Sequence, residues 1–111
     1  MSANTLDRGG ANDDEITYAA LAKALDEGAV ALVDVREPQE YEAGHVEGSQ
    51  LLPLSAFDSE QLPRDKPIVL VCRSGNRSMT ALTRARAAGF QDIWHYKGGV
   101  LGWAREGGAL V

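Results

Sequence analysis

Four apolar runs divide the chain and predict the strands of a buried sheet. The runs at residues 30–33 and 68–71 are four consecutive apolar residues each, and this is typical of strands that are covered on both faces. Two further segments at 49–54 and 93–96 are only partly apolar, lie near Pro or Gly, and are predicted as two further strands. Continuous rather than alternating apolar runs favour a parallel sheet.

Helical signals fill the segments between these runs. Thr17 is predicted to cap a helix that continues to residues 25–26, because Ile16 and Leu21 occupy the two positions of a hydrophobic staple. Gly28 is expected to end that helix. The other helices are predicted at 39–43 after Pro38, at 78–88, at 100–105, and as one turn near 57–62. The helix at 78–88 has an apolar stripe of Ala81, Leu82, Ala85 and Ala88, and it is expected to end in a Schellman motif at Gly89 and Phe90.

Strands and helices alternate along the sequence, which predicts an α/β fold. In such folds the crossover connections are right-handed, the sheet is parallel, and helices cover both of its faces. The length of 111 residues fits one domain. We assign residues 15–111 to that domain and residues 1–14, which are polar, glycine-containing and aperiodic, to a flexible N-terminal tail.

Charge and composition narrow the classes of function. The net charge of -5 argues against nucleic acid or an anionic membrane as the partner. No apolar run approaches the ~20 residues of a membrane span and no signal peptide is visible, so we expect a cytoplasmic protein. With one cysteine and two histidines the chain offers no internal disulfide and no multi-cysteine zinc site, and we expect neither a metal nor a cofactor.

The single cysteine, Cys72, stands where the central apolar run ends and a helix is predicted to follow. A loop ahead of a helix N-terminus directs several backbone N–H groups into one small space, and together with the helix dipole they form an anion site. A cysteine in that position has a depressed pKa and is a thiolate near neutral pH, hence a nucleophile. A lone cysteine at a strand end is more often an inert core residue, so the prediction depends on the loop that follows.

The residues after Cys72 are predicted to bind the substrate: Arg73, Ser74, Gly75, Asn76, Arg77 and Ser78. Arg73 and Arg77 add positive charge, and the small residues between them let the backbone curl around an anion. Asp34 and Arg36 follow another predicted strand, so we expect them at the same edge of the sheet as Cys72. Charges at loop ends often form local pairs, and we expect these two to form a supporting shell rather than to break bonds.

Several short motifs follow one another along most of the chain, in a fixed order and at a characteristic spacing. They are residues 32–37 with Glu40-Tyr41, Gly44-His45-Val46 with Gly48, residues 72–78, Gly89-Phe90, Gly98-Gly99 and Trp103. Together they cover roughly residues 16–111 and resemble the rhodanese family of sulfurtransferases. The resemblance implies a rhodanese-like α/β fold with a central, mostly parallel five-stranded sheet and helices on both faces.

The resemblance also implies a reaction. The Cys72 thiolate would take sulfane sulfur from thiosulfate or a persulfide donor, carry it as a persulfide, and pass it to cyanide, a small thiol or a protein cysteine. Arg73 and Arg77 would attract the small anionic donor. The loop has the Cys-x4-Arg length of the sulfur-handling members, whereas phosphatases with a rhodanese-like fold have Cys-x5-Arg. We therefore expect a thiosulfate sulfurtransferase (rhodanese) type enzyme. The alternatives are a phosphatase or arsenate reductase on the same anion-binding loop, and a non-catalytic rhodanese-like binding module.

Overall fold

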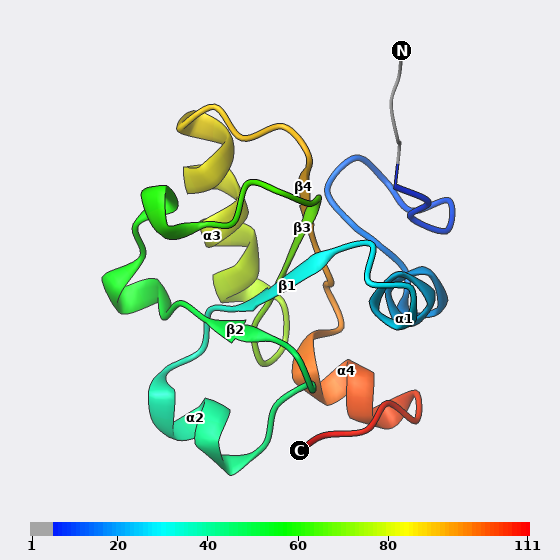
Figure 1. Ribbon diagram of the computed structural model, residues 1–111. Coiled ribbons are helices and arrows are strands. Elements are labelled where there is room, and N and C mark those ends of the chain that lie inside the picture. Colours follow the sequence, from blue (N-terminus) through cyan, green and yellow to red (C-terminus); the bar gives the residue numbers. More distant parts are fainter. Residues whose placement is uncertain (1–5) are drawn as a thin grey trace.

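The computed structural model describes residues 6–111, which form a four-stranded parallel sheet between two layers of helix (Figure 1). The strands are β1 (Ala31–Asp34), β2 (Gln50–Leu51), β3 (Ile68–Val71) and β4 (Ile93–His95), in the spatial order β2-β1-β3-β4. The register places Asp34 opposite Val71 and Leu70 opposite His95. The carboxyl ends of β1, β3 and β4 therefore meet at one edge of the sheet, where parallel α/β sheets carry their sites.

Four helices surround this sheet: α1 (Tyr18–Asp26), α2 (Pro38–Ala43), α3 (Asn76–Ala87) and α4 (Gly99–Arg105). Two 3-10 turns lie between β2 and β3, at Leu54–Ala56 and Ser59–Gln61. Helices α1 and α4 lie on one side of the sheet, α3 covers the other, and α2 lies beyond the carboxyl end of β1 (Figure 1). Among residues 6–111, no helix has both the length and the apolar character needed to cross a membrane.

The central run is apolar throughout because β3 is buried on both faces. Ile68 and Leu70 pack in the cluster that contains the apolar side of α3. Val69 and Val71 point the other way, into the cluster formed by α1 and α4. All four side chains are at most 2% exposed. The prediction of a strand with two covered faces is confirmed.

The ends of α1 and α3 follow the predicted signals. The Thr17 hydroxyl oxygen accepts a hydrogen bond from the Ala20 backbone N–H at 3.2 Å, which caps α1. At the end of α3, the Phe90 N–H donates to the Ala85 carbonyl oxygen at 3.1 Å, as the Schellman motif requires. One part of the predicted stripe is wrong: Ala88 is exposed, and it is the C-terminal cap of α3 rather than part of its packed face.

The sheet is smaller than expected. The five-stranded prediction is corrected to four strands within residues 6–111, and the strand predicted at 49–54 shortens to Gln50–Leu51. Within residues 6–111, the outer edge of β4 carries only an isolated parallel bridge between Glu15 and His95. No strand develops there because Thr17, two residues after Glu15, already caps α1 and turns the chain into the helix.

The segment before α1 makes specific contacts with the rest of the domain. Residues 1–5 of the expected flexible tail lie outside the described residues. In the remainder, the Arg8 guanidinium lies 5.1 Å from the centre of the Trp94 ring, and the Asp14 carboxylate accepts a hydrogen bond from Arg86 at 2.6 Å. The His95 backbone N–H donates to the Asp14 carbonyl oxygen at 2.9 Å. These contacts tie the N-terminal segment to β4 and α3, which the expectation of a tail did not include.

Candidate active site

Cys72 lies at the carboxyl end of β3, at the start of the loop that leads into α3. Cys72 is 1% exposed, so its sulfur is buried beneath the loop rather than exposed on its surface. The backbone carbonyl oxygen of Cys72 accepts a hydrogen bond from the Val100 N–H at 2.8 Å, and that of Arg73 accepts one from the Leu101 N–H at 3.2 Å. The first turn of α4 therefore holds the beginning of the loop in place.

The loop turns its donors towards the sulfur. The Gly75 N–H donates to Cys72 Sγ at 3.1 Å, and the Ser78 hydroxyl lies 3.6 Å from the same atom. Burial of the thiol opposes its ionisation, but hydrogen bonds from the Ser78 hydroxyl and from the backbone N–H groups of Ser78, Gly75 and Ser74 outweigh it, and they lower the pKa of Cys72. The predicted low-pKa cysteine is thus supported by geometry, and the cause is mainly hydrogen bonding.

Two glycines make this close geometry possible. Gly75 has a φ of +105°, and a Cβ added there would lie 2.5 Å from the Lys97 carbonyl oxygen. Gly99 has a φ of +68°, and a Cβ there would collide with the Arg73 carbonyl. A larger residue at either position would push the loop or α4 out of place. The Gly98-Gly99 pair that breaks the chain after β4 therefore also borders the Cys72 loop.

The loop continues directly into α3. Asn76 and Arg77, predicted as the end of the loop, already form the first turn of the helix. The positive end of the helix dipole therefore lies beside the sulfur. Arg73, Ser74 and Asn76 are exposed around this turn, where they can meet an incoming anion.

Arg77, which we expected to attract the substrate, is paired with a carboxylate. Its guanidinium makes two hydrogen bonds to Glu40 of α2, at 2.6 and 2.9 Å. The hydrogen bond from Arg77 is the main reason that the pKa of Glu40 falls to about 2. The pair joins α2 to the first turn of α3, so Arg77 positions the loop through Glu40. The sequence motif contained Glu40 but did not indicate its partner, because the two residues are 37 positions apart.

This pair predicts a pH-dependent loss of stability. A folded-state pKa of about 2, below the ordinary 4.5, means that the ion pair stabilises the fold above pH 4.5 and stops doing so as the pH falls towards 2. Both side chains are partly exposed, 34% and 27%, so Glu40→Gln should lower the free energy of unfolding by only about 1 kcal/mol at pH 7. Urea unfolding at pH 7, 4.5, 3 and 2 measures this difference.

The matched control for Glu40→Gln is Glu60→Gln. Glu60 pairs with Arg64 at 3.9 Å with both side chains well exposed, and its loss should change stability by less than about 0.5 kcal/mol at every pH. The difference between wild type and Glu40→Gln should shrink steadily between pH 4.5 and pH 2. A difference that stays constant over that range would contradict the assignment of the pair as an ionised bridge.

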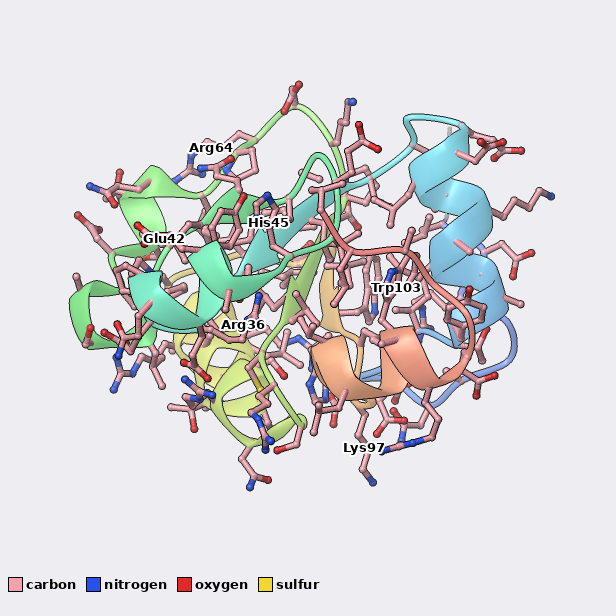
Figure 2. All side chains as sticks on the ribbon, turned by 90° about the horizontal axis from the view of Figure 1, so that it is seen from below. Arg36, Glu42, His45, Arg64, Lys97 and Trp103 are labelled. Atoms are coloured by element: carbon pink, nitrogen blue, oxygen red, sulfur yellow. The ribbon has the colours of Figure 1, made fainter. Side chains whose placement is uncertain are left out.

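Asp34 and Arg36 lie at the expected edge of the sheet, where they form a buried pair with each other. Arg36 Nη2 donates to Asp34 Oδ2 at 2.8 Å, Arg36 Nε donates to both carboxylate oxygens at 3.0 Å, and the residues are 1% and 5% exposed. Arg36 Nη2 also donates to the Gly44 carbonyl oxygen at 2.8 Å, at the end of α2. Figure 2 shows Arg36 beside α2. The pair therefore ties the end of β1 to the end of α2.

Ser78, which we expected to bind substrate, lies directly beside the sulfur. Its side chain is fully buried behind the sulfur, where the hydroxyl lies 3.6 Å from Cys72 Sγ and donates to the Gly75 carbonyl oxygen at 3.2 Å. The same hydroxyl lies 2.8 Å from Nδ1 of His95, a β4 residue that is 3% exposed. Sequence reasoning missed His95, because only the pairing of β4 with β3 brings it to the start of α3.

The comparison with known families agrees with this geometry. The model of the rhodanese-like domain family matches residues 17–106. The chain belongs to this family. The match includes the Cys72 loop, the Asp34–Arg36 pair and the Gly98-Gly99 break, so the resemblance to the rhodanese family is confirmed.

Relatives of this rhodanese-like domain occur within longer proteins. A probable adenylyltransferase/sulfurtransferase MoeZ from Mycobacterium tuberculosis is 42% identical over 82% of this chain and 24% of its own length. A tRNA uridine(34) hydroxylase from Cronobacter sakazakii is 36% identical over 74% of this chain and 26% of its own. The chain thus spans about a quarter of the length of these two relatives.

One solved structure has the same size as this domain. A rhodanese-related protein from Thermoplasma volcanium has a TM-score of 0.79 and is 32% identical, and the match covers 88% of this chain and 97% of that one. The fold prediction, an α/β rhodanese-like domain with a parallel sheet, is therefore confirmed apart from the number of strands.

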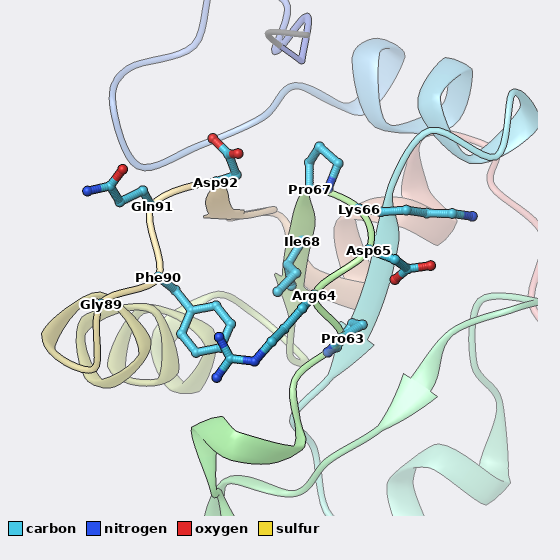
Figure 3. A pocket seen from close by; sticks show the side chains of 10 residues that line it. All are labelled: Pro63, Arg64, Asp65, Lys66, Pro67, Ile68, Gly89, Phe90, Gln91 and Asp92. Carbon is cyan, nitrogen blue, oxygen red and sulfur yellow. The ribbon is translucent and has the colours of Figure 1, made fainter. Parts of the chain in front are cut away.

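The rhodanese-like domain also carries a surface hollow that is separate from Cys72. A hollow of about 450 Å³ lies between the segment before β3 and the segment before β4, with the Arg64 guanidinium 4.5 Å from the centre of the Phe90 ring (Figure 3). It is at the edge where β3 and β4 begin, whereas Cys72 follows the end of β3. Across residues 6–111, no three His, Cys, Asp or Glu side chains lie close enough together to hold a metal ion.

Proposed function

We propose that this domain is a sulfurtransferase in which Cys72 carries sulfane sulfur as a persulfide. The observation that supports the proposal most directly is the hydrogen bonding of the sulfur: the Gly75 N–H at 3.1 Å and the Ser78 hydroxyl at 3.6 Å, with a lowered pKa of the thiol. A thiolate held among backbone donors is a nucleophile, and the same donors can hold a second, negatively charged sulfur atom. The name of the MoeZ relative, which includes sulfurtransferase activity, supports the same reaction class.

The proposed reaction has two steps. In the first, the Cys72 thiolate attacks the outer sulfur of thiosulfate, a new S–S bond forms, the S–S bond of the donor breaks, and sulfite leaves with the electron pair. In the second, cyanide, a small thiol or a protein cysteine attacks the terminal sulfur of the persulfide, and Cys72 leaves again as the thiolate. A persulfide donor would serve the first step in the same way, with a thiolate as the leaving group.

The charges around the loop are compatible with a small anionic donor. Because Arg77 is engaged with Glu40, the exposed Arg73 is the loop arginine that we propose as the first contact for the donor. We place this chemistry in the cytoplasm, where thiols stay reduced. Another relative is named as a tRNA uridine(34) hydroxylase and not as a sulfurtransferase. Membership of the family therefore does not identify the sulfur donor and acceptor, and the experiment below identifies them.

An intact-mass experiment tests the proposal. The reduced protein is incubated with thiosulfate, and with glutathione persulfide in a parallel sample, and each is then treated with cyanide. We expect a gain of one sulfur atom from at least one donor, and its loss with cyanide. A gain from glutathione persulfide alone would keep the persulfide mechanism and reject thiosulfate. No gain from either donor would reject the sulfurtransferase, and turnover of a phosphate ester or of arsenate would then favour the phosphatase or arsenate reductase alternative.

A further inference from the structure

The hydroxyl of Ser78 has one proton and three polar neighbours. It lies 2.8 Å from His95 Nδ1, 3.2 Å from the Gly75 carbonyl oxygen and 3.6 Å from Cys72 Sγ. The carbonyl oxygen and a thiolate can only accept a hydrogen bond, whereas a neutral imidazole nitrogen donates or accepts according to its tautomer. His95 is the group in this buried cluster whose state decides where the Ser78 proton points.

We propose that His95 is a positioning residue for Cys72. It carries its ring proton on Nδ1 and donates a hydrogen bond to Ser78 Oγ, so that the Ser78 hydroxyl can donate its own hydrogen bond to the thiolate. The inference rests on the proposed function, because it assumes that Cys72 works as a thiolate. His95 takes no part in the two proposed reaction steps, and the proposal gives it a role in keeping Cys72 ionised.

The distances explain why the tautomer matters. The contact of 2.8 Å between His95 Nδ1 and Ser78 Oγ is the shortest of the three. If Nδ1 had no proton, it would be the best-placed acceptor and would take the Ser78 proton away from the sulfur. With the proton on Nδ1, the Ser78 oxygen accepts, and its own proton is shared between the Gly75 carbonyl oxygen and Cys72 Sγ. A negative sulfur attracts that proton more strongly than a neutral carbonyl oxygen does.

The surroundings of His95 keep the ring neutral. Burial is the main cause that lowers the pKa of His95, and Lys97 and Arg86 act in the same direction. The carboxylates of Glu15 and Asp14, on the segment that pairs with β4, act in the opposite direction but do not cancel the burial. A neutral ring carries one proton, so a choice between Nδ1 and Nε2 exists near neutral pH.

Two variants separate this role from simple packing. His95→Asn keeps a short side chain with an amide N–H that can take the place of Nδ1–H, and His95→Phe keeps the ring but has no donor. We expect His95→Phe to raise the apparent pKa of Cys72 by about one unit, because the Ser78 oxygen loses the N–H donor that fixes its orientation and its proton can then turn from the sulfur to the Gly75 carbonyl oxygen. His95→Asn should shift it by less than about 0.3 units, because the donor is retained. The rate at which iodoacetamide alkylates Cys72, measured against pH on protein that carries no persulfide, gives the apparent pKa of each variant.

A double variant tests whether His95 acts through Ser78. Ser78→Ala alone should raise the apparent pKa of Cys72 at least as much as His95→Phe. If His95 works only by directing the Ser78 proton, the double variant Ser78→Ala/His95→Phe should show the pKa of Ser78→Ala, with no further rise. Additive shifts would overturn the proposal, since His95 would then act on Cys72 by another route.

The tautomer itself is measured on the unmodified protein. Long-range ¹H–¹⁵N correlation spectra at pH 7 report which ring nitrogen of His95 carries the proton. We expect the proton on Nδ1, and a proton on Nε2 would overturn the proposal even if every variant failed to fold. None of these measurements uses a sulfur donor. A protein that shows the Nδ1 tautomer and the shifted pKa but never gains a sulfur atom would therefore refute the proposed function alone.

Discussion

Cys72→Ser is expected to abolish sulfur transfer, lowering the turnover of thiosulfate with cyanide at least about 10³-fold. A serine hydroxyl stays protonated near neutral pH, because its pKa is far above that of a thiol, and the loop donors that lower the pKa of Cys72 cannot bring it into range. The variant should show no gain of sulfur by intact mass with any donor. A colorimetric assay of thiocyanate, run beside the mass measurement, gives the rate.

The interpretation of Cys72→Ser needs a folded variant. Serine is close in volume to cysteine, and the Gly75 N–H that donates to Cys72 Sγ at 3.1 Å can donate to the new hydroxyl oxygen. We therefore expect circular dichroism and thermal unfolding close to wild type. The chain has one cysteine, so turnover that survived in a folded variant would exclude any persulfide carried by the protein and would reject the mechanism.

Asp34→Asn is expected to lower the free energy of unfolding by about 3–5 kcal/mol, which is a large part of the stability of a domain of this size. Asparagine keeps the shape of the carboxyl group but removes its charge. Arg36, which is 5% exposed and donates to Asp34 at 2.8 and 3.0 Å, then remains as a buried cation without its anion. Urea unfolding at pH 7 measures the loss.

The second variant of this pair isolates the buried charge. Asp34→Asn/Arg36→Met removes the cation as well and fills its space with an apolar side chain, so the double variant should be more stable than Asp34→Asn alone. Sulfur transfer by Asp34→Asn, assayed where it is folded, should stay within about threefold of wild type, because the described contacts of the pair go to each other and to Gly44. A loss of stability below about 1 kcal/mol would contradict the buried pair, and a large loss of rate in the folded variant would contradict its supporting role.

The elements that could be predicted from sequence are those whose signals are local. Strand β3 is predicted by four consecutive apolar residues, and the cap at Thr17 by a staple within five positions. The Cys72 loop is also local, because strand end, thiol and helix N-terminus follow one another along the chain, and backbone N–H groups at a helix start point in one direction whatever the side chains are. Its position at the carboxyl edge follows from the α/β alternation.

The features that the sequence did not indicate are those that depend on distant segments. The fifth strand is absent from the described residues because α1 begins immediately after the bridge at Glu15. Arg77 was predicted to attract the anionic donor, and its pairing with Glu40 of α2 was not predicted. Ser78 was predicted to bind substrate, and its burial between Cys72 and His95 was not predicted. In each case the local pattern is satisfied, and the added contact depends on a partner far along the chain.

The sequence by itself determined the α/β alternation, the two central strands and a loop in which one cysteine meets the start of a helix, because these depend on hydrophobic periodicity and on backbone geometry over a few residues. The tertiary structure alone decided which groups surround that cysteine. The pairing of β4 with β3 brings His95 to Ser78, and the approach of α4 makes Gly99 contact Arg73. The reason is physical: hydrogen bonds between segments depend on the register and packing of whole elements, and no short stretch of sequence specifies them.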